Sequence, residues 1–410
     1  MSSIAVVAPE PVRPKMAGMG IRALELARAL SAEHDVRLLV PNSLEEARGA
    51  AGGVPVAALA AAEELARGFS AAVVSGHAAT DWLRRFPGMP AAVDLYDPFP
   101  IENLHYAPAL GDGPARHDAE AFAVALARGD FFLCASPEQR LFYAGALYAA
   151  GRIGPANFPG DPALERLLAV VPFGVPGEPA AGDRARGRRL ARVAPEGPLV
   201  LFGGVYDWYE PGPLLEAWPA LSDAVPDGKL LFFENPNPET TPQRAFESVR
   251  ERARRLDPSG RSIVFSPWIP YAERADLYAA ADVLVSIAAR GLETDLSYRT
   301  RLLDAAWGGV PSVTVDGGAL ARELEEAGAA RRAPRDPAGL AAAVAGALAA
   351  RAGMGAAARR FAAERSWPLV AAPLAAWCRA PRIDPGRGPL QTAPSFWSRL
   401  AARLDILPRE

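Results

Sequence analysis

The sequence predicts an α/β protein of two Rossmann-like domains that face a cleft. The chain has 410 residues, which exceeds the length that one ordinary hydrophobic core covers. Short apolar runs alternate with helical stretches in each half of the chain, a pattern typical of parallel sheets covered by helices. A segment rich in Pro, Gly and Arg, residues 172–197, separates the two series and is predicted to be a linker.

The first series predicts a domain over residues 1–180. Residues 21–32 place apolar side chains close to helical spacing, between the first two of five apolar runs. These five runs are the predicted strands Ile4–Ala8, Val36–Val40, Ala71–Ser75, Ala91–Leu95 and Phe131–Ala135.

The second series predicts a domain over residues 195–366. The Ala-dominated residues 338–365 are expected to form a helix pair broken at Gly353–Gly355. The predicted strands are Leu199–Phe202, Lys229–Phe233, Ser262–Phe265, Val283–Ile287 and Ser312–Val315.

Residues 367–410 are expected to form a crossing helix and an amphipathic tail. The tail follows a connector rich in Pro and Gly, and five large apolar side chains lie near one helical face: Phe396, Trp397, Leu400, Leu404 and Leu407. A helix packed on the body or on a partner explains this face, and a peripheral membrane anchor is the alternative.

Composition limits the function classes. A net charge of −3 gives no basic stripe for nucleic acid. Cys134 and Cys378 lie too far apart in sequence to suggest a disulfide framework or a thiolate metal site. The run at residues 4–9 is a first strand rather than a leader, and no uncharged run has transmembrane length, so we expect a cytoplasmic protein. Lysine occurs only at Lys15 and Lys229, so the arginine excess by itself carries no functional meaning.

Charged residues gather after the apolar run that ends at Ile287. They are Glu293, Asp295, Arg299, Arg301 and Asp304, followed by a helix that ends at Gly308-Gly309. A strand that delivers charges to a loop and a following helix is how an open parallel sheet builds a ligand site. The arginines suit a diphosphate and Asp304 suits a ribose hydroxyl, although each could instead form a structural ion pair.

Two glycine loops follow predicted strands. Gly18 and Gly20 open a helix whose amino terminus can bind an anion, although a tight turn without a ligand is the alternative. Gly203 and Gly204 follow the first strand of the second domain, where no basic residue occurs from Leu199 to Asp227. Arg299 and Arg301 would then have to compensate the negative charge of the phosphates. Trp268 is a candidate shelf for a nucleobase, or simply a packing residue.

Acidic and imidazole groups follow strands of the first domain. Asp94, Asp97, Glu102 and His105 follow one strand, and His77 follows another. Such groups are well placed to contact an acceptor hydroxyl, although Asp97-Pro98 also suits a plain turn. No residue pair has convincing metal-ligand spacing, and no nucleophilic serine elbow occurs.

Several of these segments together resemble family 4 glycosyltransferases of GT-B fold. Residues 266–311 resemble their carboxyl-terminal domain, and residues 18–41 resemble the opening loop, helix and second strand of their amino-terminal domain. Residues 136–158 and 170–176 resemble a bacterial subgroup, and residues 199–218 resemble the first strand and loop of the second domain. The family's second acidic position is kept as Asp304, whereas its first falls on Leu296.

The resemblance implies a hexosyltransferase-type enzyme of bacterial polysaccharide biosynthesis. It would move a sugar from a nucleotide-sugar co-substrate to a glycan, glycolipid or small-molecule acceptor, with retention and without metal or cofactor. The candidate catalytic residues are Glu293, Asp97 and His77. The candidate donor site comprises Gly18, Gly20, Gly203, Gly204, Trp268, Arg299, Arg301 and Asp304, and the candidate acceptor site comprises Asp94, Glu102 and His105. A sugar-nucleotide epimerase, a phosphorylase and a binding scaffold without turnover are the rival hypotheses.

Overall fold

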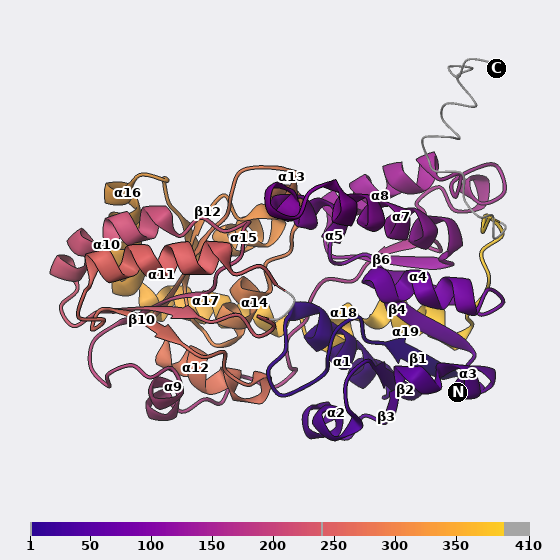
Figure 1. The fold of residues 1–410 in the computed structure, drawn as a ribbon, viewed down its shortest axis with the longest axis horizontal. Coiled ribbons are helices and arrows are strands. Elements are labelled where there is room, and N and C mark those ends of the chain that lie inside the picture. Colours follow the sequence, from indigo (N-terminus) through magenta and orange to yellow (C-terminus); the bar gives the residue numbers. More distant parts are fainter. Residues whose placement is uncertain (1, 239–240, 389–410) are drawn as a thin grey trace, which may run out of the picture.

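The computed structural model describes residues 2–238 and 241–388. Two α/β domains lie side by side along the long axis of the molecule (Figure 1). Each contains one sheet, and all strand pairs described within both sheets are parallel. The predicted architecture of two Rossmann-like domains is therefore confirmed.

The amino-terminal sheet has seven strands in the order β3-β2-β1-β4-β5-β6-β7. Ile4 pairs with Val36 on one side and with Ala71 on the other, so β1 is an interior strand of the sheet. The strands are β1 (Ser3–Val7), β2 (Asp35–Val40), β3 (Val56–Ala58), β4 (Ala71–Ser75), β5 (Ala91–Asp94), β6 (Phe131–Cys134) and β7 (Leu168–Val170). The edge strands β3 and β7 were not predicted, because three residues are too few to show a periodic pattern.

Helices cover both faces of this sheet (Figure 1). Ser43 and Ser136 cap two of them, because each hydroxyl accepts a hydrogen bond from a backbone N–H in the first turn. The helices are α1 (Gly18–Leu30), α2 (Leu44–Ala51), α3 (Ala62–Leu65), α4 (Gly76–Arg85), α5 (Phe99–Glu102), α6 (Ala107–Leu110), α7 (Asp112–Arg128) and α8 (Pro137–Ala149).

The carboxyl-terminal sheet has six strands in the order β10-β9-β8-β11-β12-β13. The chain winds one way from β8 to β10 and the other way from β11, so the topological switch point lies between β8 and β11. The strands are β8 (Leu199–Gly204), β9 (Lys229–Phe233), β10 (Ile263–Ser266), β11 (Val283–Ile287), β12 (Ser312–Val315) and β13 (Ala330–Arg332). Their helices are α10 (Gly212–Ala224), α11 (Arg244–Leu256), α12 (Arg274–Ala280), α13 (Leu292–Leu296), α14 (Thr300–Trp307), α15 (Gly318–Glu326), α16 (Pro337–Ala349) and α17 (Arg351–Ala363).

The expected linker contains helix α9 (Arg184–Leu190), which packs on α12 and is held by ion pairs from Arg184 and Arg188 to Asp282. The predicted position of the break in the Ala-rich helix pair is wrong. The break in the Ala-rich helix pair falls at Ala350, so Gly353 and Gly355 lie inside α17. A side chain at Gly355 would overlap the carbonyl oxygen of Gly309, so this glycine permits close packing rather than a turn.

The chain returns to the amino-terminal domain through α18 (Trp367–Val370) and α19 (Ala372–Arg379) (Figure 1). Val175 and Ser366 form a parallel bridge where the chain leaves and re-enters this domain. The indole of Trp377 stacks on Phe131 at 5.7 Å between ring centroids. The amphipathic tail, residues 396–407, lies outside the described residues. Over residues 2–238 and 241–388, no single helix is long and apolar enough to cross a membrane, and only the pair α16 and α17, bent by 82°, meets that test jointly.

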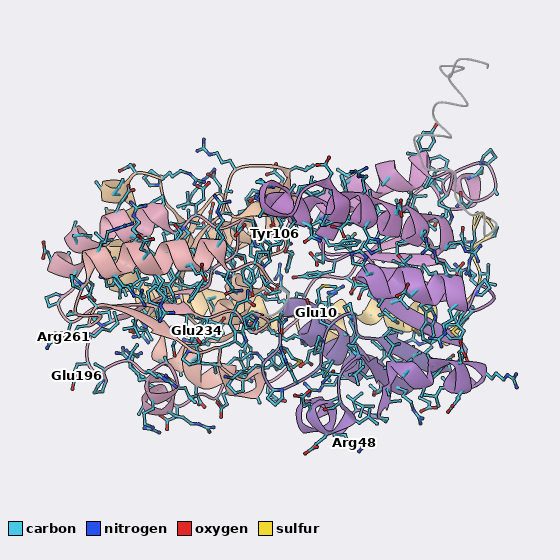
Figure 2. The ribbon with its side chains drawn as sticks, viewed as in Figure 1. Glu10, Arg48, Tyr106, Glu196, Glu234 and Arg261 are labelled. Atoms are coloured by element: carbon cyan, nitrogen blue, oxygen red, sulfur yellow. The ribbon has the colours of Figure 1, made fainter. Side chains whose placement is uncertain are left out.

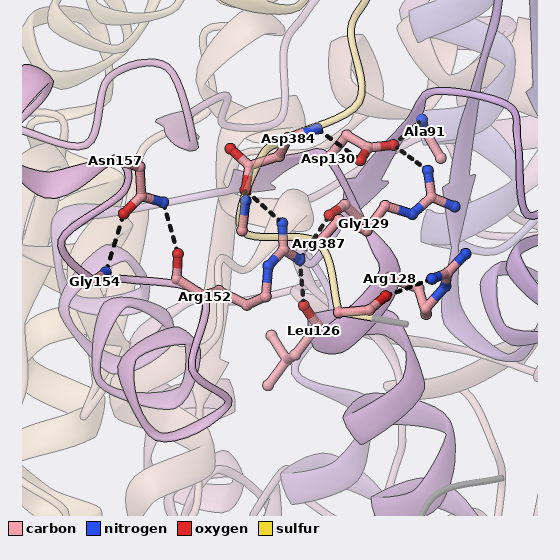
Figure 3. A network of polar contacts seen from close by, with 12 residues as sticks. Ala91, Leu126, Arg128, Gly129, Asp130, Arg152, Gly154, Asn157, Asp384 and Arg387 are labelled. Carbon is pink, nitrogen blue, oxygen red and sulfur yellow. Dashed lines mark hydrogen bonds and ion pairs between the residues drawn. The ribbon is translucent and has the colours of Figure 1, made fainter. Parts of the chain in front are cut away.

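A buried ionic network fixes residues 380–388 on the amino-terminal domain (Figure 3). Arg387 pairs with Asp130 at 2.8 Å, and Arg152 pairs with Asp384 at 2.9 Å. The backbone N–H of Asp384 also donates to Asp130, and Arg128 donates to the carbonyl oxygen of Gly388. The side chains of Asp130 and Arg387 are almost fully buried, so each depends on the other for compensation of its charge.

Candidate functional site

A cleft of about 800 Å³ lies between the two domains. Its walls are the loops that follow β1, β4 and β5 in one domain and β8, β9 and β10 in the other, together with the start of α14. Figure 2 shows Glu10 and Tyr106, which both line the cleft, at the boundary between the domains. Carboxyl ends of parallel strands thus meet from both sides, as expected for a ligand site in open α/β sheets.

Direct hydrogen bonds hold the two walls together. The hydroxyl of Tyr96 donates to the carbonyl oxygen of Tyr298 at 2.9 Å. The Gln139 amide donates to the carbonyl oxygen of Leu296 at 2.6 Å. At the opposite rim, the N–H of Tyr271 donates to the carbonyl oxygen of Pro14 at 2.8 Å. The geometry of the site therefore combines groups from both domains in one defined arrangement.

Arg301 places a guanidinium at the β8 loop. Its two Nη atoms donate to the carbonyl oxygens of Phe202 and Gly204, both at 2.9 Å, and its Cζ lies 3.9 Å from the ring centroid of Tyr209. Between these carbonyls, Gly203 has a φ of +91°, a conformation that a side chain disfavours. The loop after β8 contains no basic residue, and Arg301 of α14 places a positive charge beside it.

Asp304 lies one turn further along α14 and also lines the cleft. Its Oδ1 is 3.5 Å from Nε of Arg274. Burial raises the pKa of Asp304 to about 6, against the opposing effect of Arg274. Arg274 lies over the rings of Tyr271 and Trp307, at 3.7 and 4.8 Å. The sequence analysis missed Arg274, because an arginine at an ordinary helical position carries no local signal in this arginine-rich chain.

Glu293 and Arg299 form a buried ion pair at 2.6 Å. Glu293, expected to be catalytic, is only 3% exposed and is not among the residues that line the cleft. Arg299 does line the cleft, but Glu293 and the ring of Tyr209 occupy its guanidinium. Arg299 therefore forms the structural ion pair that the sequence analysis gave as the alternative to a phosphate contact. The family's first acidic position, Leu296, is a buried apolar side chain.

Asp97 and Glu102 form a carboxyl pair on the opposite wall. Their side chains hydrogen-bond each other, which requires one proton between them. Burial raises the pKa of Asp97 to about 6 and holds the pKa of Glu102 well above its usual range, and the nearby charge of Glu293 adds to both effects. The pair can therefore accept or donate a proton near neutral pH.

His77 lies at the rim of the same wall. Its Nε2 is 2.7 Å from Oδ1 of the buried Asp118, whose other oxygen accepts a hydrogen bond from Asn103. The ring of His117 stacks on His77 at 4.6 Å. The Asp118 carboxylate therefore fixes the position of the His77 ring, which lines the cleft.

Two of the expected acceptor residues do not line the cleft. Asp94 is buried in a bidentate ion pair with Arg22, at 2.6 and 2.9 Å, so both of its oxygens are engaged. His105, which follows α5, is not among the residues that line the cleft, and it lies close enough to Asp207 to lower the pKa of that carboxyl group. Of the donor candidates, Gly18, Gly203, Gly204 and Trp268 line the cleft, whereas Gly20 does not.

Glu10 is a lining residue that the sequence analysis missed. Gly20 donates its backbone N–H to the Glu10 carboxylate, so a side chain of this protein already occupies the amino terminus of α1. Burial raises the pKa of Glu10 to about 7, with a further contribution from Asp97. Its Oε2 is buried and has no hydrogen-bond partner among the described residues. The position of Glu10 just after the first strand is the sequence feature that could have identified it as a site residue.

Among residues 2–238 and 241–388, no group of three or more His, Cys, Asp or Glu side chains is arranged to hold a metal ion. The charge of the cleft is instead divided between its walls. Arg274, Arg299 and Arg301 lie on the carboxyl-terminal side together with the carboxyl group of Asp304, and Glu10, Asp97, Glu102 and Asp118 lie on the amino-terminal side.

Comparison with known proteins places the fold. Neither a family model nor a curated protein matches the chain by sequence. Sucrose-phosphate synthase from Thermosynechococcus elongatus is similar over 92% of this chain and 98% of its own, with 16% identity and a TM-score of 0.64. HepE from Anabaena in complex with UDP-glucose is similar over 93% and 100%, with 15% identity and a TM-score of 0.66. WaaG, a glycosyltransferase involved in lipopolysaccharide biosynthesis, is similar over 91% and 98%, with 17% identity and a TM-score of 0.60. The chain therefore has the GT-B fold of these glycosyltransferases.

Proposed function

We propose that this protein is a glycosyltransferase that moves a sugar from a nucleoside diphosphate donor to an acceptor hydroxyl. The division of charge across the cleft carries the proposal. Guanidinium groups on one wall suit a diphosphate, and carboxyl and imidazole groups on the other suit a hydroxyl that loses its proton. The similarity to HepE, which was solved with UDP-glucose, supports the same assignment.

The donor would lie along the carboxyl-terminal wall. Arg301 and the backbone N–H groups near Gly203 would stabilise the diphosphate as it departs. Asp304 would accept the ribose hydroxyls in its ionised form, with Arg274 favouring that form. Trp268 would provide the face for the nucleobase.

The acceptor would lie against the amino-terminal wall. In the reaction, the bond from the sugar C1 to the diphosphate oxygen breaks and a bond from C1 to the acceptor oxygen forms. The hydroxyl proton is released, and the ionised member of the Asp97–Glu102 pair is placed to accept it. Among the described residues, this wall has no Arg or Lys in its lining, which favours an uncharged glycan, glycolipid or small molecule over a phosphorylated acceptor.

Further features of the enzyme follow from the family resemblance. By resemblance we infer retention of configuration, a hexosyl donor, independence of metal and cofactor, and a role in bacterial polysaccharide biosynthesis. The two cysteines are buried and unpaired, which agrees with a reducing, cytoplasmic compartment. Contact with the inner face of a membrane through the tail remains a proposal from its sequence.

A second function is favoured by one observation. Leu296 stands at the first acidic position of the family that the chain resembles, and the buried acid Glu293, three residues earlier, is engaged by Arg299. A scaffold that binds nucleotide sugar without turnover would tolerate this arrangement.

A thermal-shift screen with UDP, GDP, dTDP, ADP and CMP in EDTA tests the donor site. A ligand at 100 times its dissociation constant stabilises the folded state by about 2.7 kcal/mol. A shift with one nucleoside diphosphate is the expected result, and no shift with any of them contradicts the proposal. Product analysis with the matching nucleotide sugar then separates the functions, because an epimerase alters the donor without an acceptor and a scaffold leaves it unchanged.

A further inference from the structure

An apolar surface lies on the amino-terminal wall of the cleft, where α6 meets the first turn of α7. Gly111 joins the two helices with a φ of +72°. Between positions 106 and 115, no residue that lines the cleft has a charged side chain. These lining residues, here called the α6–α7 surface, are Tyr106, Ala107, Leu110, Gly111, Pro114 and Ala115. The side chain of Leu110 is 54% exposed, so the surface is open to a ligand.

The aromatic rings beside this surface are covered by one another. Tyr106 packs edge-on against Trp208 of the other domain, at 5.9 Å between ring centroids. Tyr206 stacks on the ring of Trp208 at 5.0 Å. Tyr106 and Trp208 are each only 9% exposed, whereas Leu110 and Pro114 are exposed. The part of the α6–α7 surface that a ligand can reach is therefore aliphatic rather than a free aromatic face.

Helix α7 connects the α6–α7 surface to the candidate catalytic groups. Pro114 in its first turn and Asp118 in its second turn lie four residues apart, on one face of the helix and about 6 Å apart along its axis. Asp118 holds the ring of His77 at 2.7 Å. A hydroxyl bound beside this imidazole and the nearby carboxyl pair would thus direct the group attached to it toward the α6–α7 surface.

The chemistry of the surface selects among the proposed acceptors. Its side chains offer no hydrogen-bonding group other than the hydroxyl of Tyr106, so the hydroxyls of a glycan placed against it would lose water without gaining side-chain partners. An alkyl chain loses no polar contact there. Each methylene that it buries raises the affinity about fourfold, which corresponds to about 0.8 kcal/mol.

We propose that the α6–α7 surface binds an aliphatic chain of the acceptor, so that the acceptor is a glycolipid-like amphiphile whose chain begins close to the reacting hydroxyl. The inference rests on the proposed transferase function and narrows its acceptor to one chemical class. It also gives Leu110 a role in the choice of acceptor.

Isothermal titration with n-octyl, phenyl and methyl β-D-glucosides, each below its micelle-forming concentration, tests this inference. Wild-type protein should bind octyl glucoside at least about tenfold more tightly than methyl glucoside, because two buried methylenes already give about 15-fold. Leu110→Asp should remove this preference, and Leu110→Met should keep it. Leu256→Asp is the matched control and should also keep it, because Leu256 is an exposed leucine at the end of α11 that does not line the cleft.

Three results would overturn the inference. The first is equal affinity of wild-type protein for octyl and methyl glucosides. The second is a preference that persists in folded Leu110→Asp or that disappears equally in Leu256→Asp. The third is tighter binding of phenyl than of octyl glucoside, which would assign the surface to an aromatic group.

Titration of wild-type protein with nucleoside diphosphates separates this inference from the proposed function. If a nucleotide binds but the preference for the octyl chain is absent, only the role of the α6–α7 surface is wrong. If no nucleotide binds the folded protein, the transferase function is wrong, and the assignment of this surface to an acceptor is wrong with it.

Discussion

Substitution of Arg301 by alanine should weaken nucleoside diphosphate binding by about 10- to 150-fold. A guanidinium has five N–H donors, and Arg301 uses two of them on the carbonyl oxygens of Phe202 and Gly204. Arg301 lines the cleft, so a phosphate oxygen bound there would gain a charge-assisted hydrogen bond from one of the remaining donors. Such a bond contributes about 1.5 to 3 kcal/mol, which gives the stated range.

Isothermal titration with the nucleotide that gives the largest thermal shift measures this effect. Arg301→Lys should fall between wild type and alanine, because an ammonium keeps the charge but cannot bridge both carbonyl groups. Arg290→Ala is the matched control: its side chain is 77% exposed and pairs with Asp316 outside the cleft. If folded Arg301→Ala binds with wild-type affinity, the assignment of phosphate to this residue is refuted.

Three further predictions concern the ribose, the carboxyl pair and the ionic network. Asp304→Asn should weaken ribonucleotide binding about tenfold, and equal wild-type affinity for ribo- and 2′,3′-dideoxynucleotides would contradict the ribose role. The folded-state pKa of Asp97 is raised, so its protonated carboxyl favours folding and its ionised carboxylate opposes folding. The stability that the protonated form contributes is therefore lost as the pH rises through about 6. Asp97→Asn should therefore raise the melting temperature above that of the wild type by more at pH 8 than at pH 5, and it should reduce sugar transfer. An equal change in melting temperature at both pH values would argue against the raised pKa. Arg387→Ala leaves Asp130 as an unpaired buried charge and should cost about 3 to 5 kcal/mol in urea unfolding. The exposed Arg382→Ala is its control, and equal unfolding midpoints for the two variants would show that the pair contributes little.

The fold was predictable where local pattern and tertiary burial agree. Strands such as Ala71–Ser75 and Val283–Ile287 are continuous apolar runs because parallel strands are covered on both faces, and their predicted bounds match the structure. Helix α9 was not predicted within the linker because its sequence is rich in Arg and in helix breakers. The helix is stabilised by Asp282, which is distant in sequence and contacts Arg184 and Arg188 only in the folded domain.

The candidate site was predictable only in part, for the same reason. Arg301 and Asp304 share α14 after a buried strand, so local sequence was enough to bring them to the cleft. Arg274 and Glu10 gain their significance from neighbours on other elements. Asp94 and Glu293 looked like site residues beside strand ends, but partners placed by the fold engage both of them.

The return of the chain at Ser366 makes the carboxyl-terminal domain an insertion into the other domain. Its two ends are adjacent, since Val175 exchanges backbone hydrogen bonds with Arg365 and Trp367, both at 2.9 Å. Such a domain can be excised as a continuous piece without stretching either end, so it is a natural candidate for separate expression. Truncation at the same point would instead damage the remaining domain, because Phe131 and its neighbours would lose the cover of α18 and α19.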